Sequence, residues 1–301
     1  MTLLLPLLAA PLLLIPVLPP GGGWDNPPTG PLPAGVRHKT FRSAAMGVDV
    51  GYNLYLPPGY DAGGNANRRY PVVYWLHGLG GNETAGMFPA DVVARAVREG
   101  AVPPLILVSA NGGARTRYHD SSDGKIMADT LIAKELVAHV DKTCRTIASR
   151  RGRSIQGMSM GGNGALKFAF KYPELFGSVV AFAPALVDGD WMAANDTDFL
   201  KTMFGGDKNR YQREIAAEVL TRNAEQVINQ KVSILILIGT EDSLLDRVRK
   251  MHGLLEEKKV PHEYEELQGV PHDLNALLRP DPRRGLTFAA KQFTDAADKT
   301  R

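Results

Sequence analysis

One serine lies in a sequence pattern that can make it a nucleophile. Residues 157–161 read Gly-Met-Ser-Met-Gly and match G-x-S-x-G around Ser159. They follow a short stretch at Ser154–Ile155, expected to be a strand, and precede a helical run that begins near Gly164. Glycine neighbours let a serine stand on a tight strand-to-helix turn, and the helix N-terminus favours negative charge at a reacting carbonyl. The pattern predicts a nucleophilic Ser159; the alternative is a Gly/Ser-rich loop that only connects two elements.

A nucleophilic serine needs a histidine base, which follows the serine and an acid in chains with this strand-turn-helix motif. Three histidines follow Ser159 with room for an intervening acid: His252, His262 and His272. His252 falls within a predicted helix and His262 directly precedes a predicted strand, whereas His272 lies in a loop. We predict His272 as the base; the alternative is a surface histidine that caps the next helix.

The acid that orients the base is expected at the carboxyl end of the strand that precedes the histidine. The apolar run Ser233–Ile238 is followed by Gly-Thr-Glu-Asp, which places Glu241 and Asp242 at its end. We predict Asp242 as the acid, with Glu241 as the first alternative and Asp246 as the second. For each of them, the non-catalytic alternative is a solvated loop carboxylate.

An oxyanion hole needs two backbone N–H groups, one from the residue after the nucleophile and one from a loop after an early strand. Met160 supplies the first. The apolar run Pro71–Leu76 leads into the glycine-rich turn His77–Gly81, from which Leu79 can present the second. His77 is expected to pack or hydrogen-bond within this turn. A phosphate-binding loop is the alternative, but no nucleotide-binding motif accompanies the turn.

Short apolar runs alternate with longer segments of helical period along the chain. The apolar runs are Pro71–Leu76, Leu105–Ala110, Ser178–Phe182 and Ser233–Ile238; Gly51–Leu56, which alternates, and Glu263–Leu267 are also expected to be strands. The helical segments are Asp129–Cys144, Gly164–Tyr172, Arg247–Lys258 and Leu286–Asp298. Asp129 is a candidate cap for the first of these helices. The alternation is typical of βαβ units, so we predict an α/β fold with a mostly parallel central sheet and helices on both faces.

Composition narrows the function further. Hydrophobic residues make up 44% of the 301 residues and charged residues 22%, as in a globular chain with a sizeable core. A net charge of +3 is too small for a strong nucleic-acid footprint. The one cysteine, Cys144, allows neither an intramolecular disulfide nor a thiolate zinc cluster. We expect no metal and no cofactor, and the sequence does not indicate the oligomeric state.

The first 35 residues differ in composition from the rest. Residues 1–20 are Leu-rich and are interpreted as a signal peptide, which predicts a secreted or periplasmic protein; a cytoplasmic protein is the alternative. Prolines interrupt this stretch, so a stable membrane span is not expected. Residues 21–35 are rich in Gly and Pro and are predicted to be a linker, followed by a single domain over 36–301.

Four motifs together resemble one known family. They are LHGLGG at 76–81, IQGMSMGGNGAL at 155–166, LIGTEDSLLD at 237–246 and QGVPHDLNAL at 268–277. The set is similar to the esterase D and feruloyl esterase family of α/β-hydrolases, and most similar to the feruloyl esterase modules of bacterial xylanases. The resemblance covers roughly residues 45–295. It implies an α/β-hydrolase fold with a small cap segment, and a serine esterase that acts through an acyl-enzyme.

The same resemblance implies site residues that agree with those predicted from the motifs. Ser159 is the nucleophile, Asp242 the acid and His272 the base, with the amides of Leu79 and Met160 as the oxyanion hole. Feruloyl or acetyl esters of plant cell-wall polysaccharide are the substrates it favours. Alternatives are an S-formylglutathione hydrolase like esterase D, a general short-chain carboxylesterase, and an acyltransferase of the mycolyl type.

Two segments are candidates for substrate contact. Residues 186–230 are the expected cap, in which apolar side chains either form an aromatic acyl site or pack the cap onto the core: Trp191, Met192, Phe199, Met203 and Phe204. Of these, Trp191, Phe199 and Met203 are our candidate substrate-binding residues. The loop 111–125 can bring polar side chains near the leaving group, or leave them solvated: Arg115, Arg117, Tyr118 and His119.

Overall fold

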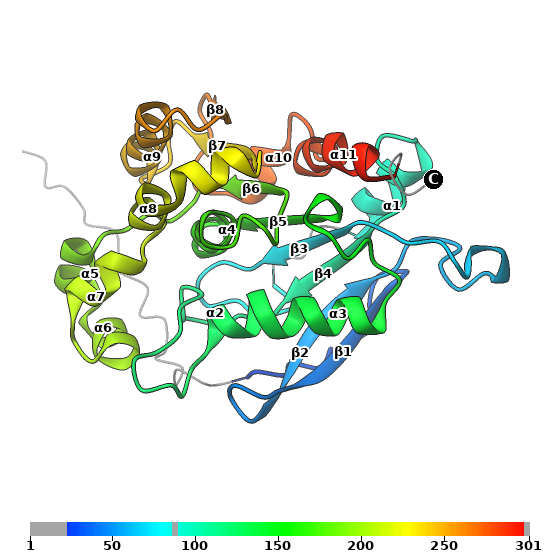
Figure 1. The fold of residues 1–301 in the computed structure, drawn as a ribbon, viewed down its shortest axis with the longest axis horizontal. Coiled ribbons are helices and arrows are strands. Elements are labelled where there is room, and N and C mark those ends of the chain that lie inside the picture. Colours follow the sequence, from blue (N-terminus) through cyan, green and yellow to red (C-terminus); the bar gives the residue numbers. More distant parts are fainter. Residues whose placement is uncertain (1–22, 86–89, 298–301) are drawn as a thin grey trace, which may run out of the picture.

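The computed structural model describes residues 23–85 and 90–297, and its centre is one eight-stranded sheet (Figure 1). The strands are β1 (Val36–Ser43), β2 (Val48–Tyr55), β3 (Val72–Leu76), β4 (Ile106–Ala110), β5 (Arg153–Met158), β6 (Ser178–Phe182), β7 (Ser233–Gly239) and β8 (Glu263–Leu267). Their order is β1-β2-β4-β3-β5-β6-β7-β8. The pairs β1–β2 and β2–β4 are antiparallel and all other pairs are parallel, which confirms the predicted mostly parallel sheet.

The edge strand β1 was not predicted from the sequence. Only Val36, Phe41 and Ser43 of its eight residues are buried, so it lacks the alternation of a half-buried strand. The inner strands β3, β4 and β6 are buried at every position, as the continuous apolar runs predicted.

Two neighbouring residues of β5 show that helices cover both faces of the sheet. Gly157 faces the start of α4 (Met160–Lys171), since a Cβ on it would lie 2.5 Å from the carbonyl carbon of Gly161. Gln156 points the other way and donates a hydrogen bond of 3.0 Å to the carbonyl oxygen of Gly285 in α11 (Arg284–Ala297). Successive side chains of a strand point to opposite faces. The two helices therefore lie on opposite sides of the sheet.

The remaining helices include the other predicted ones, with shifted ends. They are α1 (Ala90–Arg98), α2 (Ala128–Thr130), a π-helical stretch η2 (Leu131–Leu136), α3 (Val137–Thr143), α5 (Gly189–Asn195), α6 (Thr197–Phe204), α7 (Lys208–Glu214), α8 (Ala216–Asn229), α9 (Leu245–Glu257) and α10 (Leu274–Leu278), together with the 3₁₀ turns η1 (Gly63–Asn65) and η3 (Arg150–Gly152). The predicted helix over 129–144 is present as α2, η2 and α3 in succession. The helix predicted to begin near Gly164 begins earlier, at Met160.

Asp129 does not cap α2, contrary to the prediction. The backbone N–H groups of Asp129 and Thr130 donate to Oδ1 of Asp120, at 2.9 and 3.1 Å. The Asp129 side chain is instead buried and pairs with Lys167 and Lys171 of α4, each at 3.0 Å. The capping carboxylate comes from the preceding loop because these two lysines hold Asp129 in the interior.

The segment between β6 and β7 forms the predicted cap through α5, α6 and α7. Aspartate side chains accept hydrogen bonds from backbone N–H groups at each helix start: Asp188, Asp196 and Asp207. Apolar side chains of these helices form a hydrophobic cluster with residues of the neighbouring loops: Ile126, Ala128, Val187, Met192, Phe199, Leu200, Met203, Phe204 and Tyr211. An ion pair of 3.1 Å between Arg115 and Asp196 joins the loop 111–125 to the cap.

The predicted linker makes specific contacts with the domain. Residues 23–35 contain no helix or strand, as their glycine and proline content predicted. Trp24, however, is partly buried against the core, and its carbonyl oxygen accepts a hydrogen bond of 2.7 Å from the N–H of Gly51 in β2. This attachment was not expected, because the contacting residues come from distant parts of the chain. The predicted signal peptide at 1–20 lies outside the described residues.

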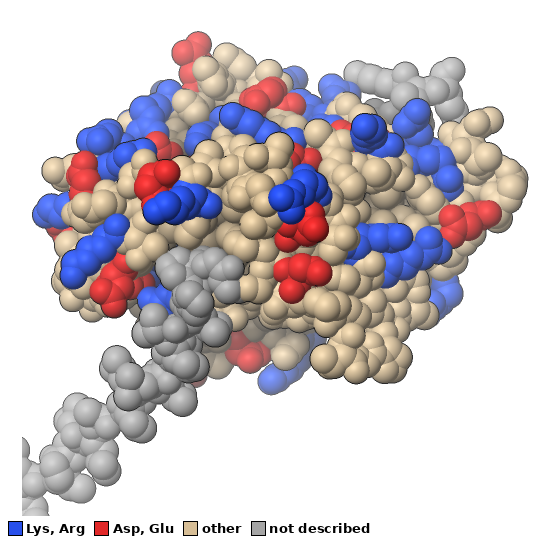
Figure 2. All heavy atoms as spheres, turned by 90° about the horizontal axis from the view of Figure 1, so that it is seen from below, with Lys and Arg blue, Asp and Glu red and all other residues tan. Residues whose placement is uncertain are grey.

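The surface carries both signs of charge. On the face shown in Figure 2, Lys and Arg side chains are interspersed with Asp and Glu. In the described part of the chain, no helix combines the length and the hydropathy that a membrane crossing requires.

Candidate active site

Ser159 stands on a strained turn between β5 and α4. Its φ of 59° and ψ of −115° are unusual for a residue with a side chain. Its N–H donates to the carbonyl oxygen of Phe182 at 2.9 Å, and its own carbonyl oxygen accepts from the N–H groups of Asn163 and Ala185 at 3.0 and 2.9 Å. These bonds hold the strained backbone between two strands and a helix, so the Ser159 side chain is fixed at the carboxyl end of β5.

The glycines that flank Ser159 are required by close backbone approach. A Cβ on Gly161 would collide with the carbonyl oxygen of Leu76 in β3, and one on Gly157 would lie 2.8 Å from the same oxygen. Met160, between Ser159 and Gly161, is buried at the first turn of α4, where helix N–H groups have no partner within the helix. The local sequence thus permits the turn that the motif predicted.

Asp242 and His272 form a hydrogen-bonded pair at the same edge of the sheet. His272 Nδ1 lies 2.6 Å from Asp242 Oδ2, and the other carboxylate oxygen accepts from the N–H of Leu244 at 2.9 Å. The Asp242 side chain is fully buried, whereas that of His272 is 37% exposed. The strands β5, β7 and β8 run parallel, so the loops that carry Ser159, Asp242 and His272 all leave the same edge.

The loops after β7 and β8 are held against each other, which explains why these two side chains meet. The N–H of Thr240 donates to the carbonyl oxygen of Leu267 at 2.9 Å, and that of Glu241 to the carbonyl oxygen of Val270 at 3.1 Å. The Gly269 N–H donates to Oγ1 of Thr240 at 2.9 Å. The backbone of each loop is therefore fixed by the other.

The alternative acids and bases lie elsewhere. Glu241 is exposed, and the Asp246 side chain is 90% exposed beside Arg249. His252 and His262 contact each other, with 2.7 Å between Nδ1 and Nε2. Of the weighed candidates, Asp242 and His272 are the acid and the histidine that the structure brings together.

The turn His77–Gly81 lies directly against Ser159. A Cβ on Gly78 would lie 3.8 Å from the Cβ of Ser159. His77 is buried and hydrogen-bonds within the turn as predicted, with Nδ1 2.8 Å from the Gly78 carbonyl oxygen, and its Nε2 accepts from the Gly112 N–H at 3.2 Å. Burial lowers the pKa of His77 to about 4, so the ring is neutral at pH 7 and serves as a brace.

Further bonds fix this turn from the loop 111–125. The Tyr118 hydroxyl donates to the His77 carbonyl oxygen at 2.9 Å, and the Gly80 N–H donates to the Ala114 carbonyl oxygen at 2.7 Å. Leu79 itself is 43% exposed. The backbone of this turn is therefore held in place beside Ser159.

A buried charge cluster behind the site was missed from the sequence. Lys167 of α4 is fully buried, pairs with Asp129 at 3.0 Å and donates to the Tyr118 carbonyl oxygen. Burial alone would raise the pKa of Asp129, but Lys167 and Lys171 hold it well below its usual range. The cluster joins α4 to the loop 111–125, which in turn holds the turn His77–Gly81. A lysine within the buried stretch 160–170 was the available signal.

The candidate substrate residues have different surroundings. Phe199 and Met203 are buried inside the cap cluster, which agrees with the alternative that they pack the cap. Trp191 is only partly buried, and its ring lies 6.0 Å from the Arg117 guanidinium and 5.6 Å from that of Arg247. A cleft of about 470 Å³ opens beside these residues and is lined by Asn163, Leu186, Val187, Ile215, Arg247 and Met251, among others.

The loop 111–125 is mostly built into the interior. Tyr118 and His119 are buried, and Arg117 is 6% exposed with its guanidinium 5.6 Å from the Phe199 ring. Arg115 pairs with Asp196 of the cap. The loop therefore connects the turn His77–Gly81 to the cap.

Fold and site together define an esterase of the α/β-hydrolase type. The serine on its strand-to-helix turn, the buried aspartate on a histidine and the rigid glycine-rich turn all lie at one sheet edge. Residues 43–276 match the family model described as "Putative esterase". The chain therefore belongs to this esterase family.

Three relatives illustrate the range of this family. An endo-1,4-beta-xylanase/feruloyl esterase of Xylanibacter ruminicola is 33% identical over 153 residues, 47% of this chain and 20% of the relative. An esterase of Mycobacterium tuberculosis is 28% identical over 266 residues, 80% of this chain and 55% of the relative. The S-formylglutathione hydrolase of Paracoccus denitrificans is 25% identical over 266 residues, 82% and 89% of the two chains. The chain thus spans a fifth of the length of the first relative and just over half of the length of the second.

Solved structures share the fold. A ferulic acid esterase superposes with a TM-score of 0.73 at 22% identity, covering 86% of this chain and 98% of the other. A serine hydrolase of Staphylococcus aureus, FphF, superposes with a TM-score of 0.69 at 19% identity, covering 84% and 98%. At these identities the likeness concerns the fold alone.

Proposed function

We propose that the chain hydrolyses carboxylic esters through an acyl-enzyme formed on Ser159. The observation that carries the proposal is the 2.6 Å contact between His272 and the buried Asp242, at the sheet edge that holds Ser159 on its strained turn. A histidine oriented by a carboxylate, beside a serine on such a turn, is the arrangement that activates a serine hydroxyl.

The proposed reaction has two steps. In the first, His272 Nε2 takes the proton of Ser159 Oγ, and Oγ attacks the ester carbonyl carbon. The N–H groups of Leu79 and Met160 stabilise the negative oxygen of the tetrahedral intermediate. The carbon–oxygen bond to the alcohol then breaks, and His272 gives the proton to the leaving alcohol.

In the second step, a water molecule attacks the acyl-enzyme. His272 takes a proton from this water and returns it to Ser159 as the acid product leaves. Asp242 keeps the proton of His272 on Nδ1 and stabilises the charged ring. No metal or organic cofactor takes part in the proposed scheme.

For the substrate, we favour feruloyl or acetyl esters of plant cell-wall polysaccharide. The four sequence motifs support this choice, and so does the likeness to the xylanase/feruloyl esterase, the relative with the highest identity of the three described above. Trp191 offers an aromatic surface at the edge of the cap, and the buried Phe199 and Met203 support that part of the cap from within. An apolar N-terminal stretch at 1–20 favours an enzyme that acts outside the cytoplasm.

An S-formylglutathione hydrolase is the second candidate, because this match covers most of the relative's length. A mycolyl-type acyltransferase would share the acyl-enzyme and differ only in the acceptor.

The test is a panel of substrates assayed with the wild type and the Ser159→Ala variant. Initial rates are measured on methyl ferulate, p-nitrophenyl acetate, p-nitrophenyl butyrate and S-formylglutathione. We expect the highest kcat/KM on methyl ferulate and loss of all activity in Ser159→Ala. A preference for S-formylglutathione would favour the second candidate, and a sugar ester formed in the presence of a sugar acceptor would favour the acyltransferase. Substantial activity in the variant would refute the role of Ser159.

A further inference from the structure

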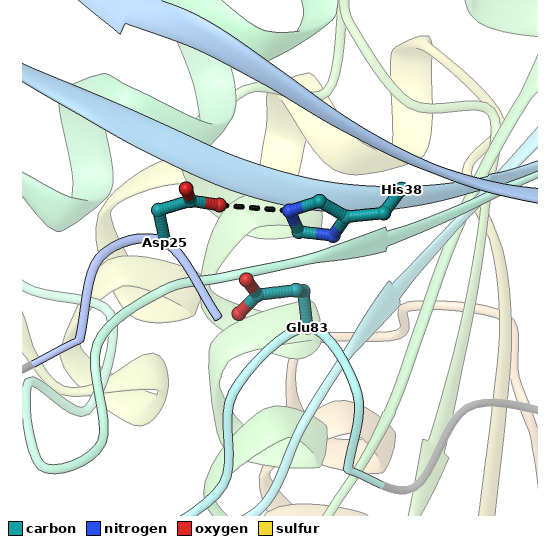
Figure 3. A group of neighbouring side chains, drawn as sticks. All are labelled: Asp25, His38 and Glu83. Atoms are coloured by element: carbon teal, nitrogen blue, oxygen red, sulfur yellow. Dashed lines mark hydrogen bonds and ion pairs between the residues drawn. The ribbon is translucent and has the colours of Figure 1, made fainter. Parts of the chain in front are cut away.

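Three potential metal ligands from distant parts of the sequence lie close together, and none of them is a proposed catalytic residue. Asp25 comes from the N-terminal segment, His38 from β1 and Glu83 from the stretch that follows the turn His77–Gly81 (Figure 3). One ligand atom of each residue lies within 4.8 Å of the other two. Figure 3 shows the Glu83 carboxylate pointing toward the contact between Asp25 and His38.

The hydrogen bonds of Asn53 fix the state of the His38 ring. Asn53 Nδ2 donates to the Glu83 carbonyl oxygen at 3.1 Å, so the Oδ1 atom of Asn53 is the one that faces His38 Nδ1, also at 3.1 Å. Nδ1 must therefore carry a proton. In a neutral ring, Nε2 then holds a lone pair, yet it lies 2.8 Å from Oδ1 of Asp25. Two electron-rich atoms at this distance require a cation between them, either a proton or a metal ion.

Glu83 adds a second, buried negative charge. The residue is fully buried, and its carboxylate accepts from the Asn26 N–H at 2.6 Å, from Asn26 Nδ2 at 2.9 Å and from Asn111 Nδ2 at 2.8 Å. These three donors hold the Glu83 carboxylate in place beside the contact between His38 and Asp25. Within residues 23–85 and 90–297, neither Lys nor Arg forms an ion pair with Glu83. A proton on His38 would balance only one of the two carboxylates.

Gly51 leaves room where the three groups converge. A Cβ at this position would collide with Glu83 Oε1, and would lie 2.7 Å from Asp25 Oδ1 and 3.0 Å from the Cε1 atom of His38. The Gly51 N–H also holds the carbonyl oxygen of Trp24, which fixes the residue next to Asp25. The space between the ligands is thus kept by the absence of a side chain.

We propose that Asp25, His38 and Glu83 bind a divalent transition-metal ion, with Zn²⁺ as the expected occupant. One imidazole nitrogen and two carboxylate oxygens suit Zn²⁺ better than Ca²⁺, which prefers oxygen ligands alone. The two carboxylates balance the charge of the ion. The bond from His38 Nδ1 to Asn53 orients the ring as in known histidine metal sites. The ion joins the N-terminal segment to β1 and to the stretch after the turn His77–Gly81.

Metal binding is tested on the untagged full chain after treatment with EDTA. The protein is dialysed against Zn²⁺, Mn²⁺ or Ca²⁺, and bound metal is measured by mass spectrometry of the digested sample. Co²⁺ gives an absorption spectrum that reports its ligands. We expect one Zn²⁺ per chain, with affinity lowered at least about tenfold in Asp25→Asn and in His38→Gln. Both changes preserve size, and circular dichroism verifies the fold.

The double variant His252→Gln/His262→Gln is the control, because these two histidines contact each other and are not part of the proposed site. It should bind Zn²⁺ like the wild type. The proposal is overturned if the wild type binds no transition metal, because a protonated His38 would then hold the cluster together. It is also overturned if the wild type binds only Ca²⁺. It is also overturned if Asp25→Asn and His38→Gln bind Zn²⁺ as tightly as the wild type, or if only the double variant loses it.

Discussion

Two histidine–carboxylate contacts in this chain have nearly the same length and different surroundings. His272 lies 2.6 Å from Asp242, and His38 lies 2.8 Å from Asp25. The remaining oxygen of Asp242 accepts from a backbone N–H, and no described residue hydrogen-bonds to Nε2 of His272. His38 uses both ring nitrogens, and a second carboxylate, that of Glu83, stands beside it.

These surroundings suit His272 to proton transfer and His38 to cation binding. A base must keep one ring nitrogen open toward the reacting group, and a single carboxylate on the other nitrogen orients it. A ring held at both nitrogens beside two carboxylates cannot exchange a proton with a substrate and instead attracts a positive ion. The environment of each histidine, more than the contact itself, thus determines its proposed chemistry.

Replacing each histidine in turn gives the largest expected contrast. His272→Ala should lower kcat by about 10⁶, as loss of the base does in serine hydrolases, with little change in stability because the side chain is partly exposed. His38→Ala should leave kcat within about threefold and lower the melting temperature. Ester hydrolysis and thermal unfolding measured on both variants verify this. Equal loss of kcat in the two would remove the distinction.

Replacing the acids extends the contrast. Asp242→Asn should lower kcat by about 10⁴, because the amide favours the wrong tautomer of His272. Glu241→Gln is its matched control, since Glu241 is adjacent in sequence and exposed, and kcat should change less than about twofold. Steady-state kinetics decide between them, and a large effect of Glu241→Gln alone would reassign the acid.

The Lys167–Asp129 pair allows a test of how much stability is lost when a buried carboxylate loses its cation. Lys167→Met should lower the free energy of unfolding by about 3–5 kcal/mol, because Asp129 loses its buried partner. Lys171→Met, at a partly exposed lysine that contacts the same oxygen, should cost less. Urea unfolding of the two variants measures both values. Equal stability of Lys167→Met and the wild type would contradict this view of the pair.

The same pair predicts that the free energy of unfolding depends on pH, with a smaller effect than the loss of Lys167 itself. The pKa of Asp129 is lowered in the folded protein, so its contribution to stability is present above the pKa of the unfolded chain and is lost as pH falls through the folded value. An aspartate in the unfolded chain has a pKa of about 3.9, so the stability gap between the wild type and Lys167→Met should narrow from pH 4 to pH 2. Urea unfolding at both values tests the sign, and a gap that widens in acid would refute it.

Local motifs made one part of the site predictable. The parts that depend on contacts between residues distant in sequence could not be predicted. Ser159 and His272 could be predicted as nucleophile and base because a few adjacent residues define the turn and the loop that carry them. The π-helical stretch η2 and the capping of α2 by Asp120 were not predictable, since the two lysines that hold Asp129 lie about 40 residues away.

The cap and the N-terminal segment show the same limit. Phe199 and Met203 lie on a short helix, whose inner and outer faces the sequence pattern does not separate, so an acyl site and a packed cap were equally compatible with it. Trp24 and Asp25 lie in a stretch whose glycines and prolines predicted a linker. Their attachment depends on Gly51 and Glu83, which share no local motif with them.

The most direct test of the catalytic proposal is the covalent intermediate itself. The wild type is incubated with an organophosphonate ester that stops at the covalent stage, digested, and analysed by peptide mass spectrometry. We expect one adduct, on Ser159, and a strongly reduced rate of labelling in His272→Ala. Labelling of another residue would contradict the assignment of Ser159 as the nucleophile. So would protein that carries no adduct after the incubation and still hydrolyses esters.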